Sequence, residues 1–202
     1  TTDEVLLSTY ICHPSMANNE LSGPVILTFL AKWLQNNKSL QKTYRIVFVP
    51  ETIGSIAVIA KNIFNLKKYT VAGFNISCVG DDRSYSYIPS RNGDTLSDKV
   101  AKHVLYWTDD KYIKYSWRDR GSDERQYCAP GVDLPVATIC RTKYGEYPEY
   151  HTSLDDLDNV VTAVGLQGSY SLFQKVLNAI ESNEYYKCNT FCEPQMGKRN
   201  LY

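Results

Sequence analysis

Short, almost wholly apolar runs alternate along this 202-residue chain with longer segments of helical period, and this alternation limits the fold more than any other feature. The apolar runs predict four strands, at 5–11, 44–49, 71–79 and 134–140. Apolar residues at helical spacing predict helices that begin near Gly23, Ser55, Thr95 and Ser153. Strands without polar alternation are buried on both faces. We therefore expect an α/β fold in which a parallel-rich mixed sheet is sandwiched between helices.

The last predicted helix is the longest, and its start is marked by Ser153 with Asp156 three residues on, a box-like cap. The chain divides into an α/β domain over 1–183 and an extended tail or linker over 184–202. A start inside a strand and an extended tail indicate a piece of a longer protein.

The charge balance argues against a nucleic-acid or membrane partner. The chain has 22 basic and 22 acidic residues and a formal net charge of zero. It contains no apolar run long enough to span a bilayer, and its N-terminus has no secretory signal. Four of the six cysteines lie in or beside apolar runs, where a reduced thiol is expected, so we predict a cytoplasmic protein. The expected partner is a small peptide or peptide-like substrate, and assembly into a homo-oligomer is left open.

Polar residues that suit a metal follow each predicted strand. His13 follows the first strand, Glu51 the second, Asp81 the third and His151 the fourth. The carboxyl ends of parallel strands gather functional residues at one edge of the sheet. Imidazole and carboxylate together are ligands for zinc, so the pattern predicts a divalent metal site. Asp82 is the rival to Asp81, which we prefer because it comes first after Gly80.

Longer motifs around these residues resemble a known family. They are the stretches 13–23 (HPSMANNELSG), 50–55 (PETIGS), 80–81 (GD), 121–127 (GSDERQY) and 150–156 (YHTSLDD). Together they are similar to the co-catalytic zinc aminopeptidase superfamily. They most resemble its aminopeptidase-like branch of bacterial proteins of unassigned function, often encoded near surface-polysaccharide genes.

The resemblance implies a phosphorylase/hydrolase-like fold and a hydrolase of aminopeptidase type. Such an enzyme would cleave an amide bond of a peptide, a peptide-like molecule or an amino-sugar conjugate through a metal-activated water. Carried over by position, the zinc ligands would be His13, Asn19, Glu51, Asp81 and His151. The resemblance implies one or two zinc ions.

Three positions depart from the family pattern. Position 19, where an aspartate would bridge two ions, is Asn19, and a neutral amide cannot neutralise two dications. The next residue, Glu20, is a candidate to substitute for that aspartate, although its side chain is expected to point elsewhere. Glu51 is a single carboxylate where the superfamily has two, so it acts either as the catalytic base or as a ligand. Ser15 replaces an aspartate that would orient His13.

Candidate substrate contacts are Asp123, Arg125 and Tyr150, of which Asp123 and Arg125 could equally form a solvated charge cluster. Two alternatives to hydrolysis stay open. Asn19 favours a degenerate member that binds a ligand without cleaving it. A cyclising acyltransferase with one zinc ion, on the same scaffold, tolerates the loss of part of the metal site.

Overall fold

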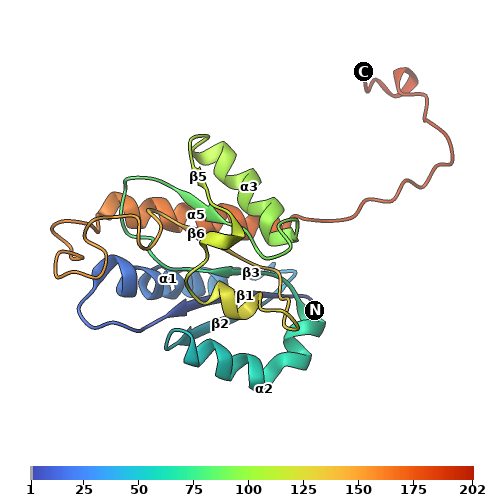
Figure 1. The fold of residues 1–202 in the computed structure, drawn as a ribbon. Helices are drawn as coiled ribbons and strands as arrows, with labels where there is room; N and C mark the ends of the chain where they lie inside the picture. Colours follow the sequence, from blue (N-terminus) through green and yellow to red (C-terminus); the bar gives the residue numbers. More distant parts are fainter. Residues whose placement is uncertain (1) are drawn as a thin grey trace.

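Six strands form the sheet in the computed structural model, which describes residues 2–202 (Figure 1). They are β1 Glu4–Tyr10, β2 Thr43–Val49, β3 Thr70–Asn75, β4 Ser86–Ile88, β5 Ile113–Lys114 and β6 Val136–Cys140. Their order across the sheet is β2-β1-β3-β6-β4-β5. The pairs β1–β2, β1–β3, β3–β6 and β4–β5 are parallel, and β4 runs antiparallel to β6. The predicted parallel-rich mixed sheet is confirmed.

Helices cover both faces of this sheet. The α-helices are α1 Ser22–Asn36, α2 Ile53–Tyr69, α3 Leu96–Thr108, α4 Glu124–Tyr127 and α5 Ala163–Glu181. A π-helix, η1 Ala17–Leu21, leads into α1, and two 3-10 turns are η2 Trp117–Asp119 and η3 Gly197–Arg199. The helices α1, α3 and α5 pack together on one face, while α2 and α4 lie on the other (Figure 1). The result is the expected three-layer arrangement.

The central strand β1 shows why the sheet needs helices on both sides. All seven of its residues are buried. Val5 and Leu7 belong to the core under α1, α3 and α5, whereas Leu6 belongs to the core with Ile59 and Leu66 of α2. Successive side chains of a strand point to opposite faces, so an uninterrupted apolar run requires two covering layers.

The prediction that the last helix begins at Ser153 is wrong. The helix α5 begins at Ala163, with Thr162 as its N-cap. The carboxylate of Asp156 accepts hydrogen bonds from the backbone N–H groups two and three residues further on, which forms a turn in place of a helix. Leu157, an apolar residue in the first part of the predicted helix, is 74% exposed.

Two other differences are local. The third strand ends at Asn75 and not at residue 79, and the chain turns at Cys78, where φ is 50°. The strands β4 and β5 are too short to give a sequence pattern. After α5 the chain continues as an exposed, extended segment that includes η3 and leads away from the layers (Figure 1). Among residues 2–202, no helix combines the length and the apolar character that a bilayer span requires.

Candidate metal centre

The carboxyl ends of β1, β2, β3 and β6 meet at one edge of the sheet because these four strands run parallel. Several non-glycine residues in the segments that leave this edge have positive φ angles of 62°, 65°, 50° and 58°; they are Ser15, Thr52, Cys78 and His151. Left-handed backbone is strained at such residues, and strain of this kind gathers at functional sites. The backbone therefore marks the same edge that the sequence motifs indicated.

Glu20 lies at the centre of this edge. Its side chain is buried, with Oε1 3.1 Å from Nδ1 of His13 and Oε2 accepting a hydrogen bond from the backbone N–H of Cys12 at 2.5 Å. The expectation that Glu20 points elsewhere was wrong. Glu20 belongs to the π-helix η1, whose wider turn changes the direction of its side chains relative to an α-helix, and π-turns of this kind are frequent at functional sites.

Asp155 holds η1 in place. Its buried carboxylate accepts hydrogen bonds from the backbone N–H groups of Asn18 and Asn19, at 2.6 Å and 3.1 Å. Sequence reasoning missed this role because it assigned the segment around Asp155 to a helix start. The available signal was the acidic pair that follows His151 by four and five residues.

Asn19, at the predicted bridging position, is buried beside Glu20. Its Oδ1 atom accepts a hydrogen bond from the hydroxyl of Tyr10 at 2.8 Å, and its Nδ2 atom donates to Oε1 of Glu20 at 3.0 Å. The amide is neutral, so Asn19 adds no negative charge here, and its oxygen already has a hydrogen-bond partner.

The ligand atoms of Cys12, His13 and Glu20 lie within 4.8 Å of one another, the one such group of three or more histidine, cysteine or acidic residues in 2–202. Sulfur, nitrogen and carboxylate oxygen all bind zinc, and three protein ligands leave a tetrahedral position open for water or substrate. The donor set therefore fits zinc. The other predicted ligands lie outside this group, and their ligand role stays a prediction; they are Asn19, Glu51, Asp81 and His151.

Asp81 is fully engaged by hydrogen bonds. Its buried carboxylate accepts from Nδ2 of Asn18 at 3.2 Å, from the backbone N–H of Arg83 at 3.0 Å, and from both the backbone N–H and the hydroxyl of Thr142 at 2.9 Å and 2.7 Å. The rival Asp82 is exposed and accepts a hydrogen bond from the hydroxyl of Thr162. Asp81 would have to exchange some of these partners in order to bind a metal.

His151 lies beside the first histidine. Its ring centroid is 4.3 Å from that of His13, and on the other side it stacks on the ring of Tyr150 at 3.9 Å. Partial burial and the neighbouring His13 lower the pKa of His151. The structure thus brings His13, His151 and Tyr150 together from two distant parts of the chain.

Glu51 is half-buried next to this group, and no hydrogen bond pairs it with a basic side chain in the part of the chain that the structure describes. Burial raises the pKa of Glu51; the nearby side chain of Ser122 and the charge of Arg125 lower it, while the charges of Asp123 and Glu20 raise it. A carboxylate that is easier to protonate than usual is suited to accept a proton from water.

Asp123 shapes the turn that carries Glu51. One of its oxygens, Oδ1, accepts from the backbone N–H of Thr52 at 2.7 Å and from the hydroxyl of Ser55 at 2.8 Å. The other, Oδ2, is buried and has no hydrogen-bond partner among the described residues. Burial raises the pKa of Asp123. Asp123, the residue before α4, is therefore buried and holds the turn at the start of α2; its role as a substrate contact stays a prediction.

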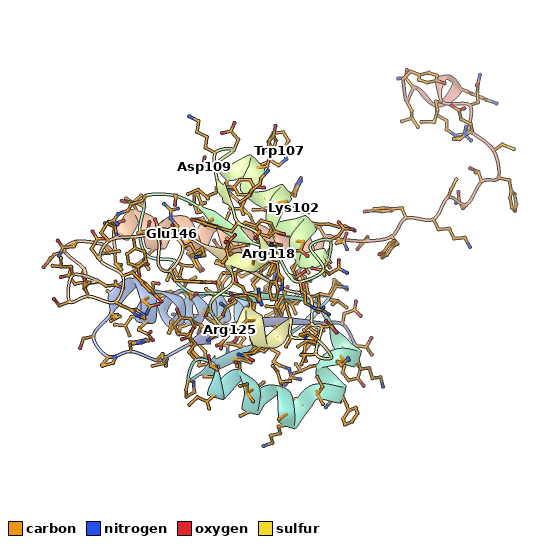
Figure 2. The ribbon with its side chains drawn as sticks, in the orientation of Figure 1. Lys102, Trp107, Asp109, Arg118, Arg125 and Glu146 are labelled. Atoms are coloured by element: carbon orange, nitrogen blue, oxygen red, sulfur yellow. The ribbon has the colours of Figure 1, made fainter. Side chains whose placement is uncertain are left out.

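Arg125 is the exposed member of the same segment. It lies on α4, and its guanidinium donates to the hydroxyl of Thr52 at 2.9 Å (Figure 2). The preceding residue, Glu124, is buried. Its carboxylate accepts hydrogen bonds from the backbone N–H of Gly121 at 2.8 Å and from the hydroxyl of Tyr144 at 2.6 Å. Arg125 is thus a positive group at the rim of an otherwise acidic site.

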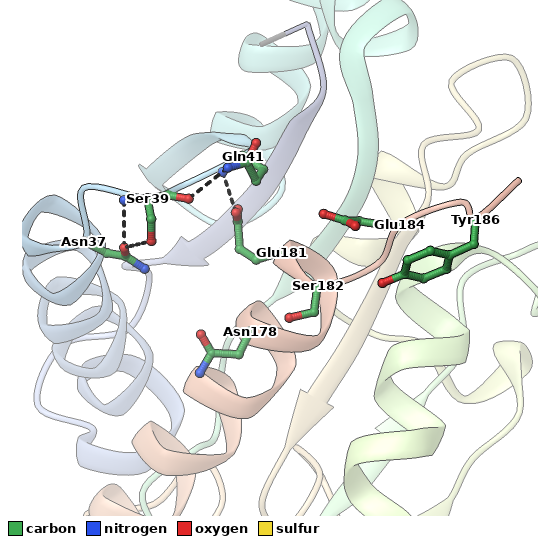
Figure 3. A pocket seen from close by; sticks show the side chains of 8 residues that line it. All are labelled: Asn37, Ser39, Gln41, Asn178, Glu181, Ser182, Glu184 and Tyr186. Atoms are coloured by element: carbon green, nitrogen blue, oxygen red, sulfur yellow. Dashed lines mark hydrogen bonds between the residues drawn. The ribbon is translucent and has the colours of Figure 1, made fainter. Parts of the chain in front are cut away.

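A separate polar groove of about 470 Å³ lies between the C-terminal ends of α1 and α5 (Figure 3). It borders the segment before β2, which is the amino end of that strand and the opposite edge of the sheet. Its Glu181 carboxylate already accepts hydrogen bonds from the backbone of Gln41 and Lys42 and from the hydroxyl of Tyr44. These bonds tie α5 to β2, so Glu181 of the groove has a structural role.

The fold is that of the zinc aminopeptidases. The LapA aminopeptidase of Legionella pneumophila has a TM-score of 0.74 and 16% identity, covering 91% of this chain and 52% of that chain. A zinc aminopeptidase of Bacillus subtilis has a TM-score of 0.71 and 16% identity, covering 90% of this chain and 47% of that chain. At these identities the likeness shows the fold alone, which is α/β and aminopeptidase-like.

The chain belongs to the family described as "Domain of unknown function (DUF4910)", whose model matches residues 1–183. A Clostridium acetobutylicum protein named "Putative polysaccharide biosynthesis protein with aminopeptidase-like domain" is 42% identical over 201 residues, or 99% of this chain and 45% of its own length. The crystal structure of a "putative peptidase" from Clostridium acetobutylicum has a TM-score of 0.89 and 41% identity, covering 98% of this chain and 46% of that chain. The resemblance to the aminopeptidase-like branch is confirmed, and the chain spans less than half the length of these relatives.

Proposed function

We propose that this domain belongs to a zinc-dependent hydrolase of aminopeptidase type. It would cleave an amide bond at the amino end of a small peptide, a peptide-like molecule or an amino-sugar conjugate. The observation that carries the proposal is the placement of the half-buried Glu51 beside the donor group of Cys12, His13 and Glu20. A base and a set of metal ligands at one sheet edge are the two parts that hydrolysis by an activated water requires.

The residues that would hold the metal are Cys12, His13 and Glu20, with His151 next to them. A bound zinc ion polarises a carbonyl group and lowers the pKa of water. In this arrangement Glu51 accepts a proton from the attacking water at its carboxylate and returns it to the leaving amine. Asp123 holds Thr52 in its left-handed conformation and so fixes the direction of Glu51.

The charges around the site suit a substrate with a free amino group. Glu20, Glu51 and Asp123 place negative charge at this edge, which attracts an ammonium group. Arg125, exposed at the rim, offers a planar donor for a carboxylate or a carbonyl further along the substrate. The name of the Clostridium acetobutylicum relative supports including amino-sugar amides among the substrates to be tested.

The test is hydrolysis by the purified 202-residue chain, supplied with zinc, of fluorogenic aminoacyl amides and of N-acylated amino sugars. We expect release of the amine that stops on chelation, returns with zinc and falls by about 100-fold or more in Glu51→Gln. The matched control is Glu146→Gln, since Glu146 is an exposed carboxylate outside the site (Figure 2). Equal loss in both variants, or activity that chelation leaves unchanged, would refute the proposal.

One observation favours the second candidate, a protein that binds its ligand without hydrolysing it. The four hydrogen bonds to the carboxylate of Asp81 leave it poorly available to a second metal ion. Zinc-dependent ligand binding without turnover of any amide in the panel would support this candidate.

A further inference from the structure

We infer that Cys12, His13 and Glu20 bind a single zinc ion through one sulfur, one nitrogen and one oxygen atom. The inference rests on the proposed function, because this ion would be the metal of that reaction. It goes further in two respects, since it names a thiolate ligand and gives a metal count of one.

The distances within the group carry the first step. Two ligands at 2.0–2.1 Å from a tetrahedral zinc ion lie roughly 3.3 Å apart. Nδ1 of His13 and Oε1 of Glu20 are already 3.1 Å apart, and the sulfur of Cys12 completes a group whose members all lie within 4.8 Å. Small side-chain rotations bring three donors of this kind around one ion.

The backbone carries the second step, because it fixes two of these residues next to the third. Cys12 and His13 follow directly after β1, and the N–H of Cys12 donates to Oε2 of Glu20. Glu20 is held by the π-helix η1, which Asp155 anchors through two backbone hydrogen bonds. The donors therefore meet through a built connection between β1 and η1.

The charges of the ligands indicate a single zinc ion. A thiolate from Cys12 and the carboxylate of Glu20 together balance one dication, and binding releases the thiol proton to solvent. In the aminopeptidase pattern a second ion shares a bridging carboxylate, yet position 19 carries the neutral Asn19, whose Oδ1 atom accepts a hydrogen bond from Tyr10. Asp81, another buried acid at this edge and a ligand in the aminopeptidase pattern, is held by four hydrogen bonds.

The three ligand types suit zinc. Zinc is a borderline-soft ion that binds cysteine, histidine and carboxylate in mixed sets, and three protein ligands are typical of a site with an open position. Cys12 is the exposed thiol at this edge; the other exposed cysteines, Cys188 and Cys192, lie in the segment after α5. Those two thiols therefore provide a matched control.

The experiment is a titration of the zinc-free 202-residue chain with Co²⁺, followed by near-ultraviolet absorption. A cobalt–thiolate bond gives a sulfur-to-metal charge-transfer band. We expect this band to saturate at one equivalent, to vanish in Cys12→Ser, and to persist in the double variant Cys188→Ser/Cys192→Ser. Glu20→Gln, which removes charge at nearly constant shape, should weaken the affinity for zinc by 10-fold or more. Circular dichroism of each variant verifies that it is folded.

The outcomes separate this inference from the proposed function. A band in the wild-type chain without amide hydrolysis would support the inference and contradict the function. Zinc-dependent hydrolysis without a thiolate band, or with two equivalents of zinc bound, would overturn the inference and leave the function standing. A band that Cys12→Ser retains and the tail variant loses would also overturn the inference, and no binding of Co²⁺ or zinc would overturn both.

Discussion

The side-chain amide of Asn19 donates a hydrogen bond to the buried carboxylate of Glu20, with 3.0 Å between Nδ2 and Oε1. The oxygen of the same amide accepts from the hydroxyl of Tyr10. These two contacts turn the amide NH2 group toward the anion. Asn19 and Glu20 therefore form a hydrogen-bonded pair with one negative charge. That charge is on Glu20, one residue later in the sequence than the aminopeptidase pattern implies.

Asn19→Asp is expected to destabilise the metal-free domain. The change places a second carboxylate about 3 Å from Glu20 where the structure has an attractive hydrogen bond, and a buried charge without a partner is costly. We expect a loss of about 1–3 kcal/mol in the free energy of unfolding, or roughly 2–10 °C in Tm for a domain of this size. Thermal unfolding in the presence of a chelator measures this loss.

Two comparisons make that prediction specific. The double variant Asn19→Asp/Glu20→Gln keeps the total charge and should recover most of the lost stability, since the two positions interact directly. Asn65→Asp makes the same chemical change at an exposed position of α2 and should have little effect. A drop in Tm of similar size in Asn65→Asp would show that the repulsion from Glu20 is not the cause.

Asp123→Ala is expected to loosen the turn that carries Glu51. The change leaves the backbone N–H of Thr52 without its acceptor and takes from the hydroxyl of Ser55 one of its two acceptors, which costs about 1–3 kcal/mol in the free energy of unfolding. Asp123→Asn keeps an oxygen at Oδ1 and should lose less. Urea unfolding gives the free energies, and faster hydrogen exchange at residues 52–56 should appear in the alanine variant alone. Equal stability of the two variants would argue against this anchoring role.

The layers of the fold could be predicted because each strand and helix carries its own local pattern. The buried run in β1 predicts a strand with both faces covered, whatever the rest of the chain does. The start of α5 was not predictable in this way. Asp156 can cap a helix or close a turn with equally local hydrogen bonds, and the competing turn wins here because Asp155 and His151 are held by contacts with distant residues.

The candidate site likewise has one part that the sequence predicts and another that depends on contacts between distant residues. The sequence places His13, Glu51, Asp81 and His151 at one edge of the sheet because strand direction alone determines this. It does not reveal that Glu20 turns inward, since the π-helix η1 depends on hydrogen bonds to Asp155, more than 130 residues further along the chain. Nor does it reveal that Asp81 is saturated by Thr142 and Asn18, for the same reason.

Asp98 is expected to stabilise the fold in a pH-dependent manner. Burial alone would raise the pKa of Asp98, but hydrogen bonds from Ser90, Thr95 and Tyr87 hold it below its ordinary value. A lowered pKa adds stability above the unfolded pKa of about 3.9, and this stability is lost as the pH falls through the lower pKa of the folded state. Asp98→Asn should cost about 2–3 kcal/mol near neutral pH.

Urea unfolding of the wild type and Asp98→Asn at about pH 7 and about pH 3 measures this effect. The difference between the two proteins should be full at the higher pH and smaller at the lower one. Asp94→Asn, an exposed aspartate in the segment before the same helix, is the control. A difference that grows on acidification would contradict the sign of the pKa shift.

His13 and His151 are adjacent in space, and the single-zinc site predicts different effects for them. His13 belongs to the donor group, so His13→Ala should lose bound zinc, whereas His151→Ala should keep one equivalent and lose mainly the rate of hydrolysis. His103→Ala, at an exposed position of α3, is the control for a histidine outside the site. Elemental analysis of the purified variants gives the zinc content. If both His13→Ala and His151→Ala lost the metal, both of these adjacent rings would be metal ligands, as the resemblance to the aminopeptidases implies, and the assignment of three ligands from Cys12, His13 and Glu20 would be wrong.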